Sequence, residues 1–277
     1  MYILKVEERV LIILMKSEIH FISGLPRSGS TLLAAILRQN PQFVAGMTSP
    51  VASIFRSVED STARKVETSV FISDDQRERL LKGIFLNYYE DFGNKIVFDT
   101  SRMWCARLPL LTKLFSQSKV ICCVREIGWV MDSFERIYRR NDQKPSGIYG
   151  FDTCGTVYSR TISIAQSSGV VGYALDALRE AYASEQSDRL LLIDYESLCK
   201  DPQVEVNRIY DFIGQEKFDH NFKQVEYSAG EFDRQLGAPG LHDVKGEVEW
   251  RPRETILPIT LFERFNEDNF WRVKCPG

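Results

Sequence analysis

The fold of this chain is decided by one stretch of sequence, Gly24-Leu25-Pro26-Arg27-Ser28-Gly29-Ser30-Thr31. The segment before it, residues 18–23, is short and rich in apolar residues, as a buried strand would be. The segment after it, residues 32–38, is rich in helix formers. A strand, a glycine-bounded turn and a helix N-terminus in this order create a nest of backbone N–H groups that binds phosphate. The sequence therefore predicts a phosphate-binding loop over residues 24–31.

The glycine spacing of this loop is that of nucleoside-triphosphate enzymes, G-x-x-x-x-G-K-[ST], with one difference. Ser30 stands where the motif has its lysine, and the loop cation is instead Arg27. The loop suits phosphate but lacks the lysine that reaches β- and γ-phosphates. This disfavours a small-molecule kinase, which also needs a site for Mg²⁺. Such a kinase, and a nucleotide-binding scaffold without turnover, stay open as alternatives.

Composition narrows the class of protein further. The 277 residues are 44% hydrophobic and 26% charged, with a net charge of −3, which is typical of a globular chain. A negative net charge disfavours nonspecific binding to nucleic acid or to anionic membranes, so we predict neither as a partner. Any site for an anion must then be built from a few local arginines.

The cysteines and the N-terminus indicate a cytoplasmic protein, and no Pro/Gly/Ser-rich linker divides the sequence, so we predict one domain, residues 1–277. Among the six cysteines there is no C-x-x-C pair, and Cys122 and Cys123 are adjacent within an apolar run, as buried thiols would be. The apolar run at residues 10–14 is too short to span a bilayer. We predict that residues 1–16 form an edge strand or a flexible tail.

Strands alternate with helices along the rest of the chain. Ser73 and Gln76 form a capping-box pattern for a helix whose apolar residues Leu80, Leu81, Ile84, Phe85 and Tyr88 are spaced for one buried face. Asp201-Pro202 opens another helix, with Val204 and Ile209 expected to point inward. Further helices are predicted at residues 104–115, 130–140 and 169–184. Buried strands are predicted to end at Ser23, Asp99, Val124 and Asp194.

This alternation predicts an α/β fold, with a central parallel sheet flanked by helices on both faces. Ligands of such sheets bind at the carboxyl ends of the strands. Arg125 follows one predicted strand, and Ser133 lies eight residues later, near the start of a helix. A guanidinium and a hydroxyl so placed predict a second anion site.

The loop at 24–31, taken with Val124-Arg125-(seven residues)-Ser133-Phe134, resembles the sulfotransferase superfamily, in a bacterial form related to protein-tyrosine and carbohydrate sulfotransferases. The resemblance implies a P-loop NTPase-like sulfotransferase fold. It also implies 3′-phosphoadenosine 5′-phosphosulfate (PAPS) as co-substrate, with no metal. By resemblance, Arg27, Ser28, Gly29, Ser30 and Thr31 wrap the 5′-phosphosulfate, while Arg125 and Ser133 hold the 3′-phosphate.

Two later segments fit the same resemblance. Residues 192–198 are similar to a strand end whose tyrosine, here Tyr195, lies near the nucleotide. Residues 241–246 resemble a late loop that closes over the donor, which implies a donor contact for Lys245.

The general base is the least defined part of the predicted site. Many relatives have Lys-[Ser/Thr]-Pro-Arg after the strand, where this chain has Asp99-Thr100-Ser101-Arg102. The glutamate base of protein-tyrosine sulfotransferases is absent from residues 45–50. We therefore predict that Asp99 is the base or orients the acceptor, with His242 in reserve. The alternatives are that Asp99 caps the segment after its strand and that His242 is a solvated loop residue.

The predicted reaction is transfer of the sulfuryl group from PAPS to a hydroxyl or amine, releasing adenosine 3′,5′-bisphosphate (PAP). Arg27 and Asp99 are the predicted catalytic residues. The acceptor is a small molecule, a glycan or a peptide, and its pocket is expected to involve residues 47–69 and 138–158. The sequence carries no signal for the oligomeric state.

Overall fold

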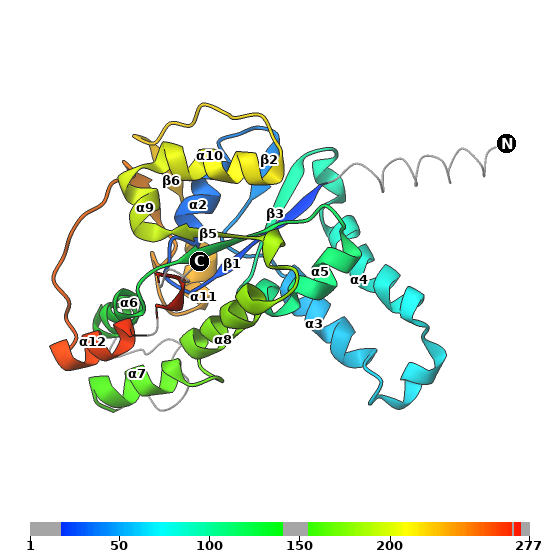
Figure 1. The fold of residues 1–277 in the computed structure, drawn as a ribbon, viewed down its shortest axis with the longest axis horizontal. Coiled ribbons are helices and arrows are strands. Elements are labelled where there is room, and N and C mark those ends of the chain that lie inside the picture. The colour runs from blue at the N-terminus through cyan, green and yellow to red at the C-terminus, as the bar shows by residue number, and fades with distance from the viewer. Residues whose placement is uncertain (1–17, 141–154, 268, 273–277) are drawn as a thin grey trace.

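The computed structural model describes residues 18–140, 155–267 and 269–272 (Figure 1). The edge strand or tail predicted for residues 1–16 lies outside the described residues. So do residues 141–154, which belong to one of the two segments predicted to shape the acceptor pocket.

Five parallel strands form the central sheet. In spatial order they are β2 (Phe43–Ala45), β3 (Ile96–Thr100), β1 (Ile19–Gly24), β4 (Val120–Val124) and β5 (Leu190–Asp194). All four neighbouring pairs are parallel. Every residue of β1 is buried, as expected for the middle strand of a sheet that is covered on both faces. Strand β2 was not predicted because three residues are too few to show a period.

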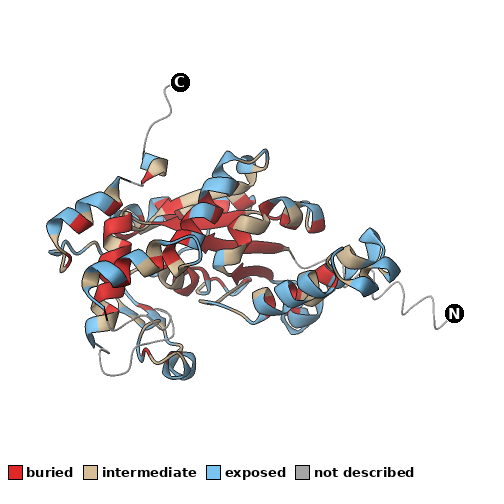
Figure 2. Cartoon of the chain, turned by 90° about the horizontal axis from the view of Figure 1, so that it is seen from below, coloured by how far each residue is buried: buried red, intermediate tan, exposed pale blue. Residues whose placement is uncertain are grey.

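Helices cover both faces of the sheet, which confirms the predicted α/β class (Figure 1). On one face, Ile22, Ile121 and Ile193 pack in a core with α2 (Ser30–Leu37), α9 (Tyr195–Lys200) and α10 (Pro202–Ile213). The strand side chains that alternate with these, among them Phe21 and Val120, pack on the other face of the sheet against four more helices. These are α5 (Leu108–Leu114), α6 (Ile127–Arg140), α8 (Val170–Ala183) and α12 (Ile259–Asn266). Figure 2 shows the buried residues gathered in the strands and on the helix sides that face them.

Helix signals read from the sequence are confirmed at two N-termini. Helix α4 (Asp74–Tyr88) begins with both hydrogen bonds of the Ser73–Gln76 capping box, and Asp201 caps α10 by accepting from the N–H of Val204. The predicted buried face of α4 is only partly right. Leu81 and Phe85 are buried, whereas Leu80 and Tyr88 are exposed, because α4 and α3 (Val51–Ser61) project from the sheet as an arm (Figure 1). Val204 is also exposed, against expectation.

Residues 104–115 do not form the single helix that was predicted. A 3₁₀ helix, η3 (Arg102–Arg107), precedes α5, and Pro109 lies in the first turn of α5. Proline is tolerated there but would break the interior of a longer helix, so the α-helix can begin only at this point.

The remaining elements are short or peripheral. Strands β6 (Val225–Tyr227) and β7 (Val244–Gly246) pair antiparallel in a separate two-stranded sheet. Helices α7 (Val157–Ala165) and α11 (Gly230–Gln235) complete the α-helices of the described residues. The other 3₁₀ helices in these ranges are η1 (Glu67–Phe71), η2 (Glu90–Phe92), η5 (Ser187–Arg189) and η6 (Phe270–Arg272).

Four of the cysteines, Cys105, Cys122, Cys123 and Cys199, are buried free thiols, as predicted for the adjacent pair. Burial raises the pKa of Cys123 to about 12, so its thiol stays protonated. Across the described ranges, no helix combines the length and apolar character needed to cross a bilayer, and no side chains cluster as metal ligands.

Gly24 provides the first test of the fold. Its φ is 102°, and a Cβ there would clash with the carbonyl oxygen of Cys123 on β4. Gly24→Ala is therefore expected to lower the free energy of unfolding by at least about 2 kcal/mol. The control is Gly214→Ala, where φ is 70° but open space surrounds the position. It should lose only about 1 kcal/mol. Urea unfolding measures both losses, and equal losses would contradict the packing described.

Candidate active site

The carboxyl ends of the strands open into a cavity of about 670 Å³. Residues that follow β1, β3, β4 and β5 all line it, so four segments distant in sequence meet there. Most of the predicted donor-binding residues are among the lining residues: Arg27, Gly29, Ser30, Thr31, Arg125, Ser133 and Tyr195. The two predicted anion sites are therefore two regions of one cavity.

The phosphate loop presents backbone N–H groups to this cavity. Helix α2 begins at Ser30 with Gly29 as its N-cap residue, and it has neither a side-chain cap nor an acidic residue in its first turn. The first N–H groups of a helix have no intrahelical partner and favour an anion. Ser28 has a different role, because its hydroxyl is buried and donates to the carbonyls of Leu25 and Cys123. Of Ser28, only the backbone remains available to a ligand.

Arg27 connects the two predicted anion sites. It has a left-handed backbone conformation, with φ at 59°, which a non-glycine residue rarely adopts. Its Nε donates to the Ser133 hydroxyl at 3.1 Å, and its Nη1 donates to the Leu241 carbonyl at 3.1 Å. The loop cation is thus held between α6 and the late loop rather than extending into solvent.

Arg125 and Tyr195 line the cavity where β4 and β5 end. The Cζ of Arg125 lies 4.3 Å from the centre of the Tyr195 ring. The Nε of Arg125 is buried and has no hydrogen-bond partner among the described residues, and burial lowers the pKa of this guanidinium. A Cβ on Gly29 would lie 2.7 Å from Tyr195 Cδ2, so only glycine lets the ring approach the loop. A buried guanidinium with an unmet donor is suited to an anionic ligand.

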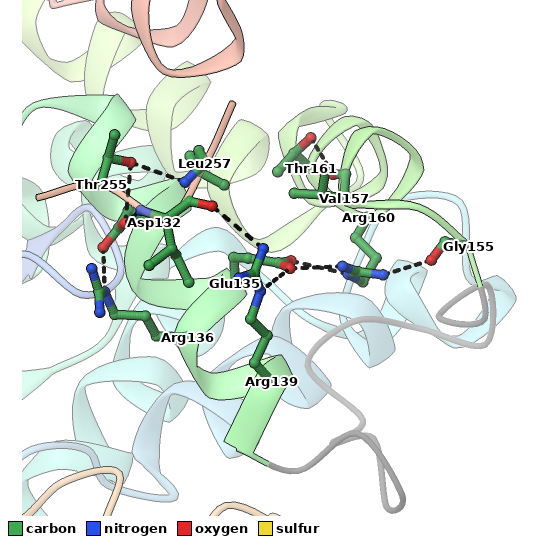
Figure 3. A network of polar contacts seen from close by, with 11 residues as sticks. Asp132, Glu135, Arg136, Arg139, Gly155, Val157, Arg160, Thr161, Thr255 and Leu257 are labelled. Carbon is green, nitrogen blue, oxygen red and sulfur yellow. Dashed lines mark hydrogen bonds and ion pairs between the residues drawn. The ribbon is translucent and has the colours of Figure 1, made fainter. Parts of the chain in front are cut away.

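Arg253 also lines the cavity, and sequence reasoning missed it. Its Nη2 forms an ion pair with Asp132 Oδ2 at 2.8 Å. Asp132 is fully buried and also accepts from the Arg136 guanidinium and from the N–H of Ile256 (Figure 3). No local pattern in the sequence marks Arg253. It reaches the cavity only because its own segment, more than a hundred residues after α6, docks on that helix.

Glu135, one turn further along α6, holds a different part of the molecule. Its carboxylate binds Arg160 through two hydrogen bonds of 3.0 and 2.7 Å and also accepts from Arg139 (Figure 3). Arg136 and Arg139 pair with the acids four residues before them, and neither lines the cavity.

Asp99 does not reach the cavity, so its predicted role as base is not supported by its position. It is fully buried and accepts from the hydroxyls of Ser49 and Tyr89 and from Trp104 Nε1. Alternate residues of a strand face opposite sides, so Thr100 lines the cavity while Asp99 points toward the helices. Burial raises the pKa of this carboxyl.

Asp99 nevertheless fixes part of the cavity wall. The Ser49 hydroxyl that donates to Asp99 also accepts from the N–H of Val51 at the start of α3. Met47 and Thr48, immediately before it, line the cavity. The capping role left open for Asp99 at Ser101 or Arg102 is filled by Ser101 itself, which accepts from the N–H of Met103.

His242 does lie in the cavity. Its Nδ1 is 2.5 Å from Asp233 Oδ1, and its backbone N–H donates to Asp233 Oδ2 at 2.9 Å. Asp233, on α11, is fully buried. His242 also follows Leu241, whose carbonyl accepts from Arg27. Lys245 by contrast is exposed and does not line the cavity, because it alternates with the lining residue Val244 on β7.

Comparison with known proteins places this geometry in a family. The model of the sulfotransferase family matches residues 20–220, which is more than two thirds of the chain. The chain belongs to the sulfotransferase family. The predicted reaction class, PAPS-dependent transfer of a sulfuryl group, is thereby confirmed at the level of the family, which does not specify the acceptor. A search of curated proteins found no match.

Solved structures support the same fold. The sulfotransferase domain of the Synechococcus PCC 7002 olefin synthase is 17% identical, with a TM-score of 0.54 over 94% of this chain and 96% of that one. The domain from the curacin biosynthetic pathway is 18% identical, with a TM-score of 0.53 over 95% and 93%. Sulfotransferase STF9 from Mycobacterium avium is 13% identical, with a TM-score of 0.52 over 99% and 81%. Identities this low establish the sulfotransferase fold alone.

The ion pair between Asp132 on α6 and Arg253 can be tested by substitution. Asp132→Asn removes the charged partner of Arg253 and is expected to weaken PAP binding roughly tenfold. The control, Glu135→Gln, changes an equally buried acid on the same helix that does not contact Arg253. It should leave the PAP dissociation constant unchanged. Calorimetry measures the PAP dissociation constants, at a temperature where circular dichroism shows that both variants are folded. Equal weakening in both would refute a specific role for Asp132.

Proposed function

We propose that the cavity binds PAPS and transfers its sulfuryl group to a hydroxyl or amine of an acceptor, releasing PAP. The observation that carries this proposal is the buried, unpartnered Nε of Arg125, which lies in one cavity with the N–H groups of the phosphate loop. A ligand with anionic groups at two places would satisfy both. The four buried thiols suit the cytoplasmic location expected from the sequence, since thiols stay reduced there.

Each anionic group of the donor has a matching set of residues. The loop N–H groups and Arg27 would hold the 5′-phosphosulfate, while Arg125 and Ser133 would hold the 3′-phosphate. Arg253 joins this second set, because it lines the same cavity and burial lowers its pKa, as it does for Arg125. Guanidinium forks favour phosphate through paired hydrogen bonds.

The chemistry of sulfuryl transfer fits a loop without the P-loop lysine. The reaction is an in-line displacement with a loose transition state, so positioning and charge stabilisation dominate, as in phosphoryl transfer. Negative charge develops on the leaving 5′-phosphate. Arg27 is already held by Ser133 and Leu241, so it is oriented before charge develops. A preorganised donor of this kind contributes about 2.7–4 kcal/mol.

We propose that His242, rather than Asp99, takes the proton of the acceptor. When its Nδ1–H donates to Asp233, the unprotonated Nε2 is the acceptor position of the imidazole. Asp233 then holds the ring in that tautomer, which is how a buried carboxylate supports a histidine base. The shared contact of Leu241 with Arg27 keeps this base next to the transfer centre.

Two arginine variants test the proposed donor site. Arg27→Ala is expected to lower kcat about 100- to 1,000-fold, because it removes a donor aimed at the charge that develops in the transition state. Arg125→Ala is expected to weaken PAP binding at least about tenfold, because it removes a charged hydrogen-bond donor. Transfer of radiolabelled sulfate from PAPS to a panel of phenols and alcohols measures the first effect, and calorimetry with PAP measures the second.

The control for both is Arg264→Ala on the exposed side of α12, outside the cavity, which should change neither quantity. PAP binding without any transfer would favour the scaffold alternative, and binding that required Mg²⁺ would favour the kinase. If Arg27→Ala and Arg125→Ala both behaved like the control, the donor site would be wrongly placed.

Substitutions at the histidine test the proposed base. His242→Gln is expected to lower kcat about 10²- to 10⁴-fold while PAP affinity stays unchanged. Asp233→Asn should give a smaller loss in the same parameter. The control is His220→Gln, since His220 is buried against Tyr210 and outside the cavity. A kcat unaffected by His242→Gln in single-turnover kinetics would show that another group takes the proton.

A further inference from the structure

The cavity has a second group of cations, on the opposite side of the phosphate loop from the predicted 3′-phosphate site. In the sheet, β1 and its loop lie between β4 and β3. Arg125 and Tyr195 follow β4 and β5 on one side, whereas Arg102 follows β3 on the other. Both sides line the same cavity. If the donor extends from the loop toward β4 and β5, the β3 side is left for the acceptor.

Arg102 is rigidly placed but has an unused side chain. Its carbonyl accepts from the Ser23 hydroxyl at 3.3 Å, and the same hydroxyl accepts from the N–H of Cys105 at 3.2 Å. These bonds fasten the start of η3 to the end of β1. Arg102 lines the cavity and is exposed, and its guanidinium makes no hydrogen bond or ion pair with any described residue. An arginine held by its backbone with a free fork is suited to a ligand.

Two neighbours add positive potential on this side. Arg56 on α3 lines the cavity and has one ion-pair partner within the described ranges, Asp60, at 3.8 Å. The N-terminus of α8, at Gly169 and Val170, also lines the cavity and has neither a side-chain cap nor an acidic residue in its first turn. Helix α8 packs directly against η3, which begins at Arg102. Helix N-termini favour anions, so these features act together.

The surroundings do not neutralise this charge. Among the described residues that line the cavity, the one carboxylate is Asp243, which lies on the late loop and accepts from the Ser228 hydroxyl. The uncharged lining residues of this side include the apolar Met47, Met103 and Tyr173, and also the hydroxyl-bearing Thr48, Thr100 and Ser101. The β3 side is therefore a surface of mixed polarity with an excess of positive charge.

We propose that the β3 side of the cavity is an acceptor subsite for molecules that carry an anionic group, a carboxylate or a phosphate, in addition to the hydroxyl that receives the sulfuryl group. This inference rests on the proposed sulfuryl transfer and specifies its substrate class. Arg102 binds the anion through its fork, Arg56 and the α8 N-terminus add attraction, and the apolar residues contact the acceptor between its two polar ends.

The segment that ends β3 presents one cation to this side of the cavity. Asp99 is turned into the core, whereas Arg102, three residues later, lines the cavity.

The experiment uses three matched phenols, titrated into PAP-saturated protein by calorimetry. They are 4-hydroxyphenylacetate, 4-hydroxybenzylphosphonate and the neutral 4-hydroxyphenylacetamide. At least one anion is expected to bind roughly tenfold more tightly than the amide, because Arg102 adds a charge-assisted hydrogen bond at a partly solvated site. Comparison of the two anions shows whether the subsite favours a carboxylate or a phosphate-like group.

Arg102→Gln is expected to remove this preference while leaving the affinities for the amide and for PAP unchanged, and Arg102→Lys should restore part of it. The matched control is Arg79→Gln, an exposed arginine of α4 outside the cavity, which should keep the preference. If no anion binds more tightly than the amide, or the preference survives Arg102→Gln, the inference is wrong although PAP still binds. Failure of wild-type protein to bind PAP would refute the proposed function itself.

Discussion

The site depends on the packing of the phosphate loop against the end of β4. Gly24 approaches Cys123 too closely for any side chain, the N–H of Leu25 donates to the Cys123 carbonyl at 2.9 Å, and the Ser28 hydroxyl donates to the same oxygen at 2.8 Å. One carbonyl therefore fixes the loop at several points. The residue after β4 is Arg125, so the same packing sets the distance between the loop and the second cluster of cations. A loop attached only through β1 could tilt, and Arg27 would lose Ser133.

Three buried carboxylates hold the walls of the cavity around this centre. Asp132 binds the segment that carries Arg253, Asp99 binds the turn at Ser49, and Asp233 binds His242. In each case the acid accepts hydrogen bonds from a segment other than its own helix or strand, and it has neither a place in the cavity lining nor direct access to solvent. A buried charge is tolerable only when its partners are complete, so each acid strongly favours one arrangement of its wall. Side chains held by such acids need little reorganisation when a ligand binds.

Local signals in the sequence were sufficient for the framework and for most of the residues that line the cavity on the proposed donor side. The loop, the strand ends and the caps at Ser73 and Asp201 are set by neighbouring residues, so they could be predicted. The Asp99 prediction rested on the position of a lysine in relatives, which does not show the face of the strand on which a side chain lies. Asp99 lies on the face opposite the cavity-lining Thr100, since a step of one residue moves a side chain to the other face. Arg253 and the Asp233–His242 pair depend on the docking of late segments, which no local pattern encodes. The position of Lys245 likewise does not support its predicted donor contact, since strand alternation points its side chain outward.

The charge distribution of the chain explains how a protein of net charge −3 can bind polyanions. Five arginines line the cavity, Arg27, Arg56, Arg102, Arg125 and Arg253, against one aspartate among the described lining residues. A concave site with low-dielectric walls concentrates such a field, while acids elsewhere on the surface limit nonspecific attraction. Because β1 lies between β3 and β4, the loop divides this field into two halves. In the reaction that we propose, a group transferred between two anionic molecules passes over the loop, where Arg27 lies between the two halves.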